Sequence, residues 1–369
     1  MNREFIQRSF QEYYSQTQVK APPSIEQREF GVGSEKKIDS RHLTFNNIDR
    51  LNFYLRSAVP LYISYSAAFY EYPDARPMSN KNWIGADLIF DLDADDCEVE
   101  CTHPPGDICE ECMKQVTTEA SRLVNGFLKT DFGFKKEDMI IVFSGNRGFH
   151  VHVRHEKVSD LNQDARKEII DYITAENIKL ITPGTDKQLL GPKPETPGWG
   201  GRIALALYES IKSSNGPKDF KEKTGIKSSG VTRLFKNKQT TLEALDTGIW
   251  SKTGLSANAL NDLITDTAGK LRVNLDKGVT MDMARLIRLP GSLHGGTGMK
   301  ACEIEDITKF DAFTDPLVFD EKPFKVRPKQ DKDFKLKNKY FQLEKGQAVE
   351  LPKYAAMYAV CKDWVNIDD

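Results

Sequence analysis

Two aspartates separated by one residue are the strongest chemical feature of the sequence. Asp91 and Asp93 belong to the run Leu88–Asp93, whose apolar residues and polar flanks predict a short strand. Side chains alternate between the faces of a strand, so the two carboxylates would share one face. Two such carboxylates repel unless a cation lies between them, and hard oxygen ligands suit Mg²⁺ or Mn²⁺. The spacing therefore indicates a divalent-metal site of the kind that serves phosphoryl transfer, although an acidic strand end without a ligand has the same pattern.

A group of cysteines follows this strand directly. Cys101-x-His103 and Cys109-x-x-Cys112 provide two ligand pairs separated by a turn, and Cys97 is a spare ligand for the first pair. Tetrahedral Zn²⁺ requires four such ligands, and a closed set of four protein ligands is structural and not catalytic. The spacing predicts a structural zinc site, with free or buried cysteines as the alternative.

A glycine-rich turn between two apolar runs carries the next set of chemical groups. The run Met139–Phe143 predicts a strand, and it continues into Ser144-Gly-Asn-Arg147-Gly-Phe-His150. Glycine lets the backbone approach a ligand closely, and Ser, Arg and protonated His all donate hydrogen bonds to phosphate oxygens. A phosphate site is therefore one interpretation, and a hairpin with a half-exposed arginine is the other.

A second glycine turn near the C-terminal end repeats these ingredients. A strand is predicted over Leu271–Leu275, ending at the third carboxylate, Asp276, and a helical segment over Met281–Leu286. The following residues contain Arg288 and His294 around Pro-Gly and Gly-Gly pairs. This segment predicts a second group of anion-binding side chains.

The composition sets limits on the class of protein. The 369 residues have a net charge of −2, so any nucleic-acid-binding surface must be local. No apolar run approaches the ~20 residues that cross a bilayer, and the N-terminus lacks an apolar signal core. Cysteines clustered for metal binding also favour an intracellular protein. We therefore expect a cytoplasmic protein with no membrane partner.

The remaining pattern predicts the elements that position these groups. Helical periodicity is present around Ile6–Tyr13 and over 47–56, 114–129 and 160–177, and an aromatic, strand-like run extends from Leu61 to Tyr72. The composition changes after residue 155. We predict three parts: residues 1–155 as the first part of a catalytic core, with the zinc motif at about 97–112; 156–270 as a mainly helical insertion; and 271–369 as the second part of the core.

Taken together and in order, these motifs resemble those of the small, catalytic subunit of archaeal and eukaryotic DNA primases, the archaeal form most closely. The resemblance covers nearly the whole chain. It is carried by Arg28-Glu29-Phe30, Asp91-Leu-Asp93, the Cys/His cluster, Ser144-Gly-Asn-Arg147-Gly-Phe-His150 and Arg285-Leu-Ile-Arg288-Leu-Pro-Gly-Ser-Leu-His294. Each motif is weak alone, and their order makes the set specific.

The resemblance implies a fold and a set of site residues. The fold is an α/β (mixed α+β) primase catalytic core with a zinc-binding motif and a mainly helical insertion. The implied catalytic residues and Mg²⁺ or Mn²⁺ ligands are Asp91, Asp93 and Asp276. The implied nucleotide-binding residues are Ser144, Arg147, His150, Arg288 and His294, with Glu29 and Arg41 near the nucleotide. The implied structural Zn²⁺ ligands are Cys101, His103, Cys109 and Cys112, with Cys97 as a substitute for a member of the first pair.

The resemblance also implies an activity and partners. The activity is that of a DNA-directed RNA polymerase-type nucleotidyltransferase, which makes short RNA or DNA primers on a single-stranded DNA template. NTPs or dNTPs are the substrates, a primase large subunit completes a heterodimer, and the replication machinery is the wider partner. Two positions depart from the family pattern: Gly296, where some relatives have Lys, and Asn146, where some have Arg. Two alternatives are a zinc-containing nucleic-acid-binding scaffold with an inactive core and an unrelated metal-dependent phosphohydrolase.

Overall fold

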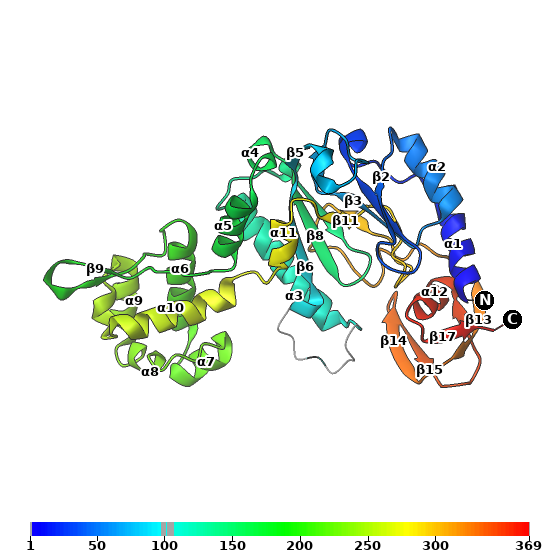
Figure 1. Ribbon diagram of the computed structural model, residues 1–369. Coiled ribbons are helices and arrows are strands. Elements are labelled where there is room, and N and C mark those ends of the chain that lie inside the picture. The colour runs from blue at the N-terminus through cyan, green and yellow to red at the C-terminus, as the bar shows by residue number, and fades with distance from the viewer. Residues whose placement is uncertain (1, 97–100, 102–106, 369) are drawn as a thin grey trace. The chain divides into compact units, whose positions relative to one another are not determined.

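The computed structural model describes residues 2–96, 101 and 107–368, and it confirms a mixed α/β chain (Figure 1). The chain forms two compact units. The first contains Met1–Val124, Phe134–Lys167 and Leu275–Asp369, and the second contains Asn125–Gly133 and Glu168–Asn274. The main segment of the second unit therefore begins later than the predicted insertion at 156–270. A short earlier segment, Asn125–Gly133, also belongs to this unit.

That earlier segment joins the second unit through specific contacts. Asp131 Oδ2 accepts hydrogen bonds from Tyr172 Oη and Arg202 Nη2, both at 3.0 Å. The guanidinium of Arg202 also lies 4.2 Å from the ring centroid of Phe127. These contacts join residues that are 41 to 75 positions apart, which periodicity within a local window does not reveal.

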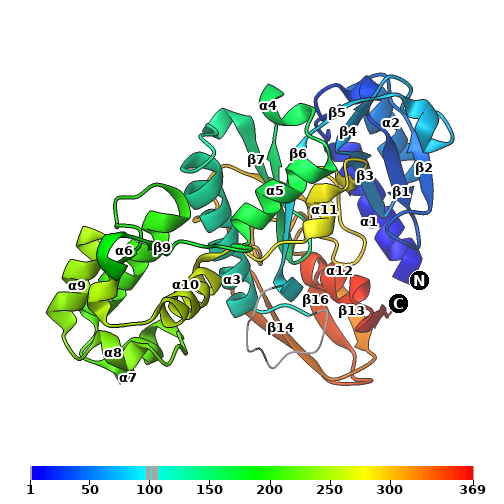
Figure 2. The ribbon, with the colours of Figure 1, turned by 60° about the vertical axis from the view of Figure 1, so that its left-hand side comes forward.

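Two four-stranded antiparallel sheets position the chemical groups of the first unit (Figures 1 and 2). The first sheet has the order β11–β3–β1–β2 and the second has the order β12–β7–β8–β6. The strands of the first sheet are β1 (Phe30–Gly33), β2 (Ser40–Leu43), β3 (Tyr62–Ser66) and β11 (Leu286–Arg288). Those of the second are β6 (Leu88–Asp93), β7 (Met139–Phe143), β8 (Gly148–Val153) and β12 (Cys302–Ile304).

The strand β6 has the bounds predicted from its apolar run. Its Leu88, Phe90 and Leu92 are fully buried, and Asp91 and Asp93 alternate with them. Asp91 pairs with His150, and Asp93 pairs with Gly148. A Cβ atom at Gly148 would lie 2.1 Å from the carbonyl oxygen of Leu92, so only glycine allows β8 to approach β6 here.

Helices complete the first unit. They are α1 (Asn2–Gln16), α2 (Ile48–Ala58), α3 (Glu110–Ser121), α4 (Glu156–Ser159), α5 (Gln163–Ile173, which continues into the second unit), α11 (Lys277–Met281) and α12 (Lys353–Cys361). Asn47 is the N-cap of α2, because its side chain accepts from the backbone N–H of Arg50. The helix α3 packs on β6 and β8 and passes directly into the π-helical segment Arg122–Lys129.

Further strands lie in smaller sheets of the same unit. They are the pair β4 (Ala68–Tyr70) and β5 (Trp83–Ala86), the sheet β16 (Val349–Pro352), β13 (Pro323–Pro328) and β17 (Val365–Ile367), and the pair β14 (Lys332–Leu336) and β15 (Lys339–Leu343). The Lys-rich run at 322–339 therefore contains the whole of β13 and β14 and the first residue of β15.

The second unit is mainly helical. It contains α6 (Gly198–Ser213), α7 (Pro217–Thr224), α8 (Val231–Leu234), α9 (Lys238–Thr247), α10 (Ala257–Leu271) and the short pair β9 (Thr182–Pro183) and β10 (Leu189–Leu190). Trp250 is fully buried, and its Nε1 donates to the carbonyl of Pro192 at 2.9 Å.

Two predictions near this boundary are wrong. Leu271–Leu275 is not a strand. Leu271 is the last residue of α10, and the apolar residues Val273 and Leu275 lie in the irregular segment that follows this helix. The segment Met281–Leu286 is not a helix, because α11 ends at Met281 and β11 begins at Leu286. Strand pairing with β3, a long-range interaction, overrides the local helical pattern at this point.

None of the helices in the described part of the chain has the length and apolar composition to cross a membrane.

Candidate active site and metal centre

A pocket of about 300 Å³ is lined by both four-stranded sheets of the first unit. It brings together seven of the predicted site residues: Arg41, Asp91, Asp93, Ser144, His150, Arg288 and His294. Arg147, Glu29 and Asp276 are not in its lining. The roles assigned to these residues in catalysis and nucleotide binding stay predictions.

Asp91 is the electrostatic centre of the pocket. Burial raises the pKa of its carboxyl to about 7, and the charges of Asp93 and Asp276 act in the same direction. The exposed guanidinium of Arg285 acts against this rise. A carboxylate that is costly to ionise beside two other acids is the environment that a bound divalent cation relieves. The donor set therefore fits Mg²⁺ or Mn²⁺.

Asp276 reaches this strand through the backbone. Its N–H donates to the carbonyl of Asp91 at 3.0 Å, and its carboxylate Oδ1 accepts from the N–H groups of Gly278 and Val279 as the N-cap of α11. In the described part of the chain, the oxygen atoms of Asp91, Asp93 and Asp276 do not all lie within 4.8 Å of one another. Because Oδ1 of Asp276 accepts the two N-cap hydrogen bonds of α11, Oδ2 is the oxygen that remains for a metal.

Arg288 provides a buried positive charge in the pocket. Its side chain comes from β11, and only 8% of the residue is exposed. Nη1 is buried without a hydrogen-bond partner, while the guanidinium carbon lies 5.0 Å from the ring centroid of Tyr62. Burial lowers the pKa of Arg288 to about 10, which leaves it charged at neutral pH. A buried guanidinium without an anion is unfavourable, so this group fits an anionic ligand.

His294 is oriented by the backbone that follows it. The N–H of Gly296 donates to its Nδ1 at 3.2 Å, so the neutral ring carries its proton on Nε2 and can donate from there. Burial, with Arg288 adding to it, lowers the pKa of this ring well below its ordinary value. His294 is therefore a neutral hydrogen-bond donor in the ligand-free protein, and not the cation that the sequence led us to expect.

His150 lies beside the carboxylate pair on β8. Its Nε2 is 3.6 Å from Asp91 Oδ1, and its Nδ1 is buried without a hydrogen-bond partner. Burial lowers the pKa of His150 to about 3, and the nearby Arg288 and Arg285 contribute in the same direction. This ring too is neutral at neutral pH.

The two glycine turns pack against each other, and this contact places His294. Thr297 Oγ1 donates to the carbonyl of Gly145 at 2.5 Å. Gly145 has a φ of +80°, and a Cβ atom there would lie 3.0 Å from Cβ of His294. The positive φ and the close approach explain the glycine beside Ser144, whose hydroxyl oxygen accepts from the N–H of Asn146 at 3.4 Å.

Arg147 is engaged by acids. Its Nε lies 2.9 Å from Asp93 Oδ1, and its Nη2 lies 2.6 Å from Asp95 Oδ2. These contacts engage Nε and Nη2, so the predicted contact with nucleotide would fall to Nη1 or would change these pairs.

Glu29 is fully buried and holds Arg41. Its carboxylate accepts from Arg41 Nε at 2.9 Å and from the N–H of His42 at 3.2 Å. Lys81 is also fully buried, with its Nζ 3.6 Å from Glu29 Oε2. Arg41 lines the pocket and Glu29 does not, so any effect of Glu29 on a ligand would pass through Arg41.

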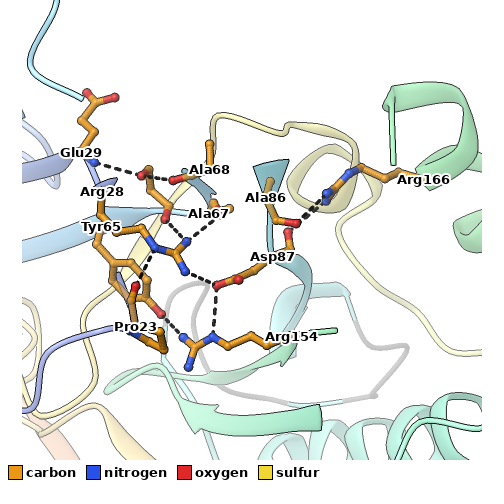
Figure 3. A network of polar contacts seen from close by, with 11 residues as sticks. Pro23, Arg28, Glu29, Tyr65, Ala67, Ala68, Ala86, Asp87, Arg154 and Arg166 are labelled. Atoms are coloured by element: carbon orange, nitrogen blue, oxygen red, sulfur yellow. Dashed lines mark hydrogen bonds and ion pairs between the residues drawn. The ribbon is translucent and has the colours of Figure 1, made fainter. Parts of the chain in front are cut away.

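A buried polar network fixes the start of β6 (Figure 3). Asp87 Oδ2 accepts from Arg28 Nη2 at 2.9 Å and from Arg154 Nε at 3.2 Å. Arg28 also donates to the carbonyls of Ser66 and Ala67. This network ties the residue before β6 to segments of the other sheet, and thereby sets where the carboxylates of β6 stand relative to Arg288.

The network extends to the helix α5. Arg166, 1% exposed, donates from Nη1 to the carbonyl of Asp87 and from Nη2 to that of Ala86, both at 3.1 Å. Arg154 Nη2 also donates to the hydroxyl of Tyr65 at 3.0 Å. All of these groups are satisfied within the protein, so the network supports the site and does not bind ligand.

Three cysteines form the candidate zinc site. The Sγ atoms of Cys101, Cys109 and Cys112 lie 3.1 to 3.6 Å apart, far beyond the ~2.05 Å of a disulfide. Tetrahedral thiolates around Zn²⁺ are separated by about 3.8 Å, since each Zn–S bond is about 2.3 Å. The cluster fits a metal such as zinc. The predicted fourth ligand, His103, and its substitute Cys97 lie outside the described residues.

Sequence reasoning missed several lining residues. Ser64, Lys37, Asp282 and Arg285 all line the pocket. Ser64 is a small polar residue within the aromatic strand β3, which is a signal that the sequence did contain, whereas its pairing with Arg288 across the sheet is visible only in the structure. The turn that carries Lys37 gives no such signal, because exposed lysines are common.

Comparisons with known proteins identify the family. Residues 90–306 match the family model described as DNA primase small subunit. The chain is 32% identical to the DNA primase small subunit PriS of Methanococcoides burtonii, over 97% of this chain and 96% of the relative. It is 33% identical to that of Methanosarcina barkeri (97% and 95%) and 30% identical to that of Archaeoglobus fulgidus (99% and 98%).

The fold and the pocket define a protein in which carboxylates suited to a divalent metal share a pocket with a buried cation suited to an anion. The chain belongs to the DNA primase small subunit family. The predicted resemblance and fold class are therefore confirmed.

Proposed function

We propose that this chain is the catalytic subunit of a DNA primase and makes short RNA or DNA primers on single-stranded DNA. One observation carries the proposal: Asp91 and Asp93 share a pocket with Arg288, a buried guanidinium that has an unpartnered Nη1. Carboxylates suited to divalent cations beside a buried cation suited to phosphate are what nucleotidyl transfer from a nucleoside triphosphate requires. The similarity to primase small subunits supports the same activity.

The chemistry joins two nucleotides. The 3′-oxygen of one nucleotide attacks the α-phosphorus of the next, the bond to pyrophosphate breaks, and the 3′-hydroxyl proton is lost to solvent. Bound Mg²⁺ or Mn²⁺, held by Asp91, Asp93 and Asp276, would supply the positive charge that favours both the attacking alkoxide and the departing pyrophosphate.

The protein's own residues bind and orient the triphosphate. Arg288 pairs with phosphate oxygens, and the Nε2–H of His294 and the hydroxyl of Ser144 donate to them. His150 lies against Asp91 and restricts where that carboxylate can point. A triphosphate would also raise the pKa of both histidines, because an adjacent negative charge favours the protonated ring.

Partners follow from the family. We expect a primase large subunit, a single-stranded DNA template and the wider replication machinery, with NTPs or dNTPs as substrates. The zinc-binding scaffold with an inactive core is the second candidate function. A convergent set of acids around a pocket is unnecessary for a protein that only binds, and this disfavours it.

Primer synthesis is the direct test. The chain, with its large subunit added, is incubated with single-stranded DNA, labelled NTPs and Mg²⁺ or Mn²⁺, and compared with Asp91→Asn and Asp93→Asn. Template-dependent oligonucleotides from the wild type, reduced by orders of magnitude in both variants, are the expected result. Asp262→Asn, at an exposed acid of α10, is the matched control and should retain activity. DNA binding without any product from the wild type would favour the scaffold.

A further inference from the structure

Two cations of the pocket, unlike Arg41 with its partner Glu29, are unpaired among the described residues and are not used by the mechanism above. Lys37 and Arg285 line the same pocket as Asp91 and Asp93, but both are exposed, whereas Arg288 is buried. The pocket therefore has a deep cationic group and a second group at its rim. Within the described part of the chain, neither Lys37 nor Arg285 makes an ion pair.

The turn that carries Lys37 is rigidly built. Asp39 accepts hydrogen bonds from the backbone N–H groups of Ser34 at 2.7 Å, Glu35 at 2.9 Å and Lys36 at 3.2 Å. The nearby carboxylate is therefore occupied by backbone, and it leaves the ammonium of Lys37 unpaired.

Glycine is required at the start of this turn. A Cβ atom at Gly33 would lie 1.9 Å from the carbonyl oxygen of Lys36. The backbone of the turn closes tightly on β1 in consequence. Lys37 is thus placed at the pocket by a turn that is closed by its own hydrogen bonds.

Backbone hydrogen bonds also position Arg285, which comes from the C-terminal part of the chain. Its N–H donates to the carbonyl of Asp282 at 3.1 Å, and its own carbonyl accepts from the N–H of Ala67 at 2.7 Å. Asp282 is the one acid that also lines this rim, and its Oδ1 accepts from the N–H of Ala284 at 2.9 Å. The rim group as a whole, Lys37, Arg285 and Asp282, keeps an excess of positive charge.

The proposed reaction places two nucleotides in this one pocket, and each brings phosphate charge. The triphosphate of the incoming nucleotide takes the deep group around Arg288. The nucleotide that supplies the 3′-hydroxyl has its own 5′-phosphate, which would repel the triphosphate unless separate cations neutralise it. Exposed cations suit this ligand, because the primer end must shift after every addition and cannot be buried.

We propose that Lys37 and Arg285 bind the 5′-phosphate of the nucleotide that supplies the 3′-hydroxyl. This phosphate is the last internucleotide phosphate of a growing primer, or the α-phosphate of the first nucleotide. The proposal rests on the proposed function and adds a second anion subsite to it. Lys37 and Arg285 act on the KM of the strand that is extended, and not on the KM of the incoming nucleotide.

The test compares a charged and an uncharged phosphate at one position. The chain and its large subunit extend template-paired primers whose last internucleotide linkage is either a phosphate or an uncharged methylphosphonate. The wild type should extend the phosphate primer with a KM about tenfold lower, since one charge-assisted contact is lost in the analogue. The Lys37→Gln/Arg285→Gln double variant should extend both primers with the same, higher KM, and with an unchanged KM for the incoming NTP.

Two matched variants sharpen the result. Lys36→Gln removes the neighbouring exposed lysine of the same turn, which does not line the pocket, and should retain the discrimination. Lys37→Arg keeps the positive charge and should retain most of the discrimination between the two primers. Dinucleotide formation started with a nucleoside or with its 5′-monophosphate tests the first nucleotide separately, and a preference lost only there would restrict the subsite to initiation.

Several outcomes would overturn the proposal. Equal KM values of the wild type for the two primers would refute it. An equal loss of discrimination in Lys36→Gln, or a matching rise in the double variant's KM for the incoming NTP, would also refute it. Failure of the proposed function is distinguishable, because the wild type would then make no product from any primer.

Discussion

Replacing Asp91 by asparagine should stabilise the metal-free protein while it abolishes activity. Burial and the neighbouring acids raise the pKa of the Asp91 carboxyl from 3.8 to about 7. The folded state therefore binds this proton more tightly than the unfolded state, and stability falls as the pH rises from about 4 to about 7. Above pH 7 the carboxylate is ionised against its surroundings. The substitution D91N removes that unfavourable charge.

The size of the effect follows from the two pKa values. A difference of about 3 pH units at about 1.36 kcal/mol each gives an upper value of about 4 kcal/mol at pH 8. The Asp91 side chain is 22% exposed, so water screens part of this energy. We expect a gain in the free energy of unfolding of about 2 kcal/mol at pH 8, falling to zero near pH 4, where the wild-type carboxyl is protonated.

The assay is urea denaturation in the presence of EDTA at several pH values. Asp87→Asn is the control, because Asp87 is buried between Arg28 and Arg154. Its removal leaves the buried Arg28 and the half-buried Arg154 without an anion and should destabilise the fold by about 3–5 kcal/mol. Addition of Mg²⁺ should stabilise the wild type and not D91N. The reasoning is refuted if D91N is no more stable than the wild type at pH 8. It is also refuted if the gain in stability at pH 4 is as large as the gain at pH 8.

Three further predictions concern the metals and the turn. Cys109→Ser should lower both the zinc content, measured by elemental analysis, and the Tm, and a fully retained zinc content would contradict the assigned ligand set. The apparent KM for Mg²⁺ should rise about tenfold for each pH unit below about 7, because protonation of Asp91 competes with the metal; a pH-independent value between pH 6 and 8 would refute this. Gly145→Ala should raise the KM for NTP and lower the Tm, since it strains a φ of +80° and presses on His294; unchanged kinetics would show that the turn adapts.

The local part of the fold could be predicted from the sequence. The strands Leu88–Asp93 and Met139–Phe143 have the predicted bounds, because each is a short apolar run between polar residues. The strand β11 could not be found, since its three residues are selected by pairing with β3, more than 200 positions earlier in the chain. The predicted helix at Met281–Leu286 failed for the same reason.

The site was predictable in its chemistry and less so in its geometry. Asp91, His150 and Arg288 were chosen for their residue types, and they do line one pocket. That Arg147 pairs with Asp93, and that Glu29 is buried behind Arg41, depends on side-chain contacts between distant segments. The neutral state of the histidines likewise follows from burial, which spacing alone does not give.

The network around Asp87 has a consequence for the order of folding. Its partners lie 59, 67 and 79 residues away in the sequence, at Arg28, Arg154 and Arg166. During synthesis Asp87 emerges long before Arg154, which pairs with its carboxylate, and before Arg166, which donates to its backbone carbonyl, so its native burial is not complete until both arrive. The strand β6 is therefore completed late, as a single cooperative step. Nascent chains that end before residue 154 should leave β6 unprotected in hydrogen exchange, and those that extend beyond α5 should protect it.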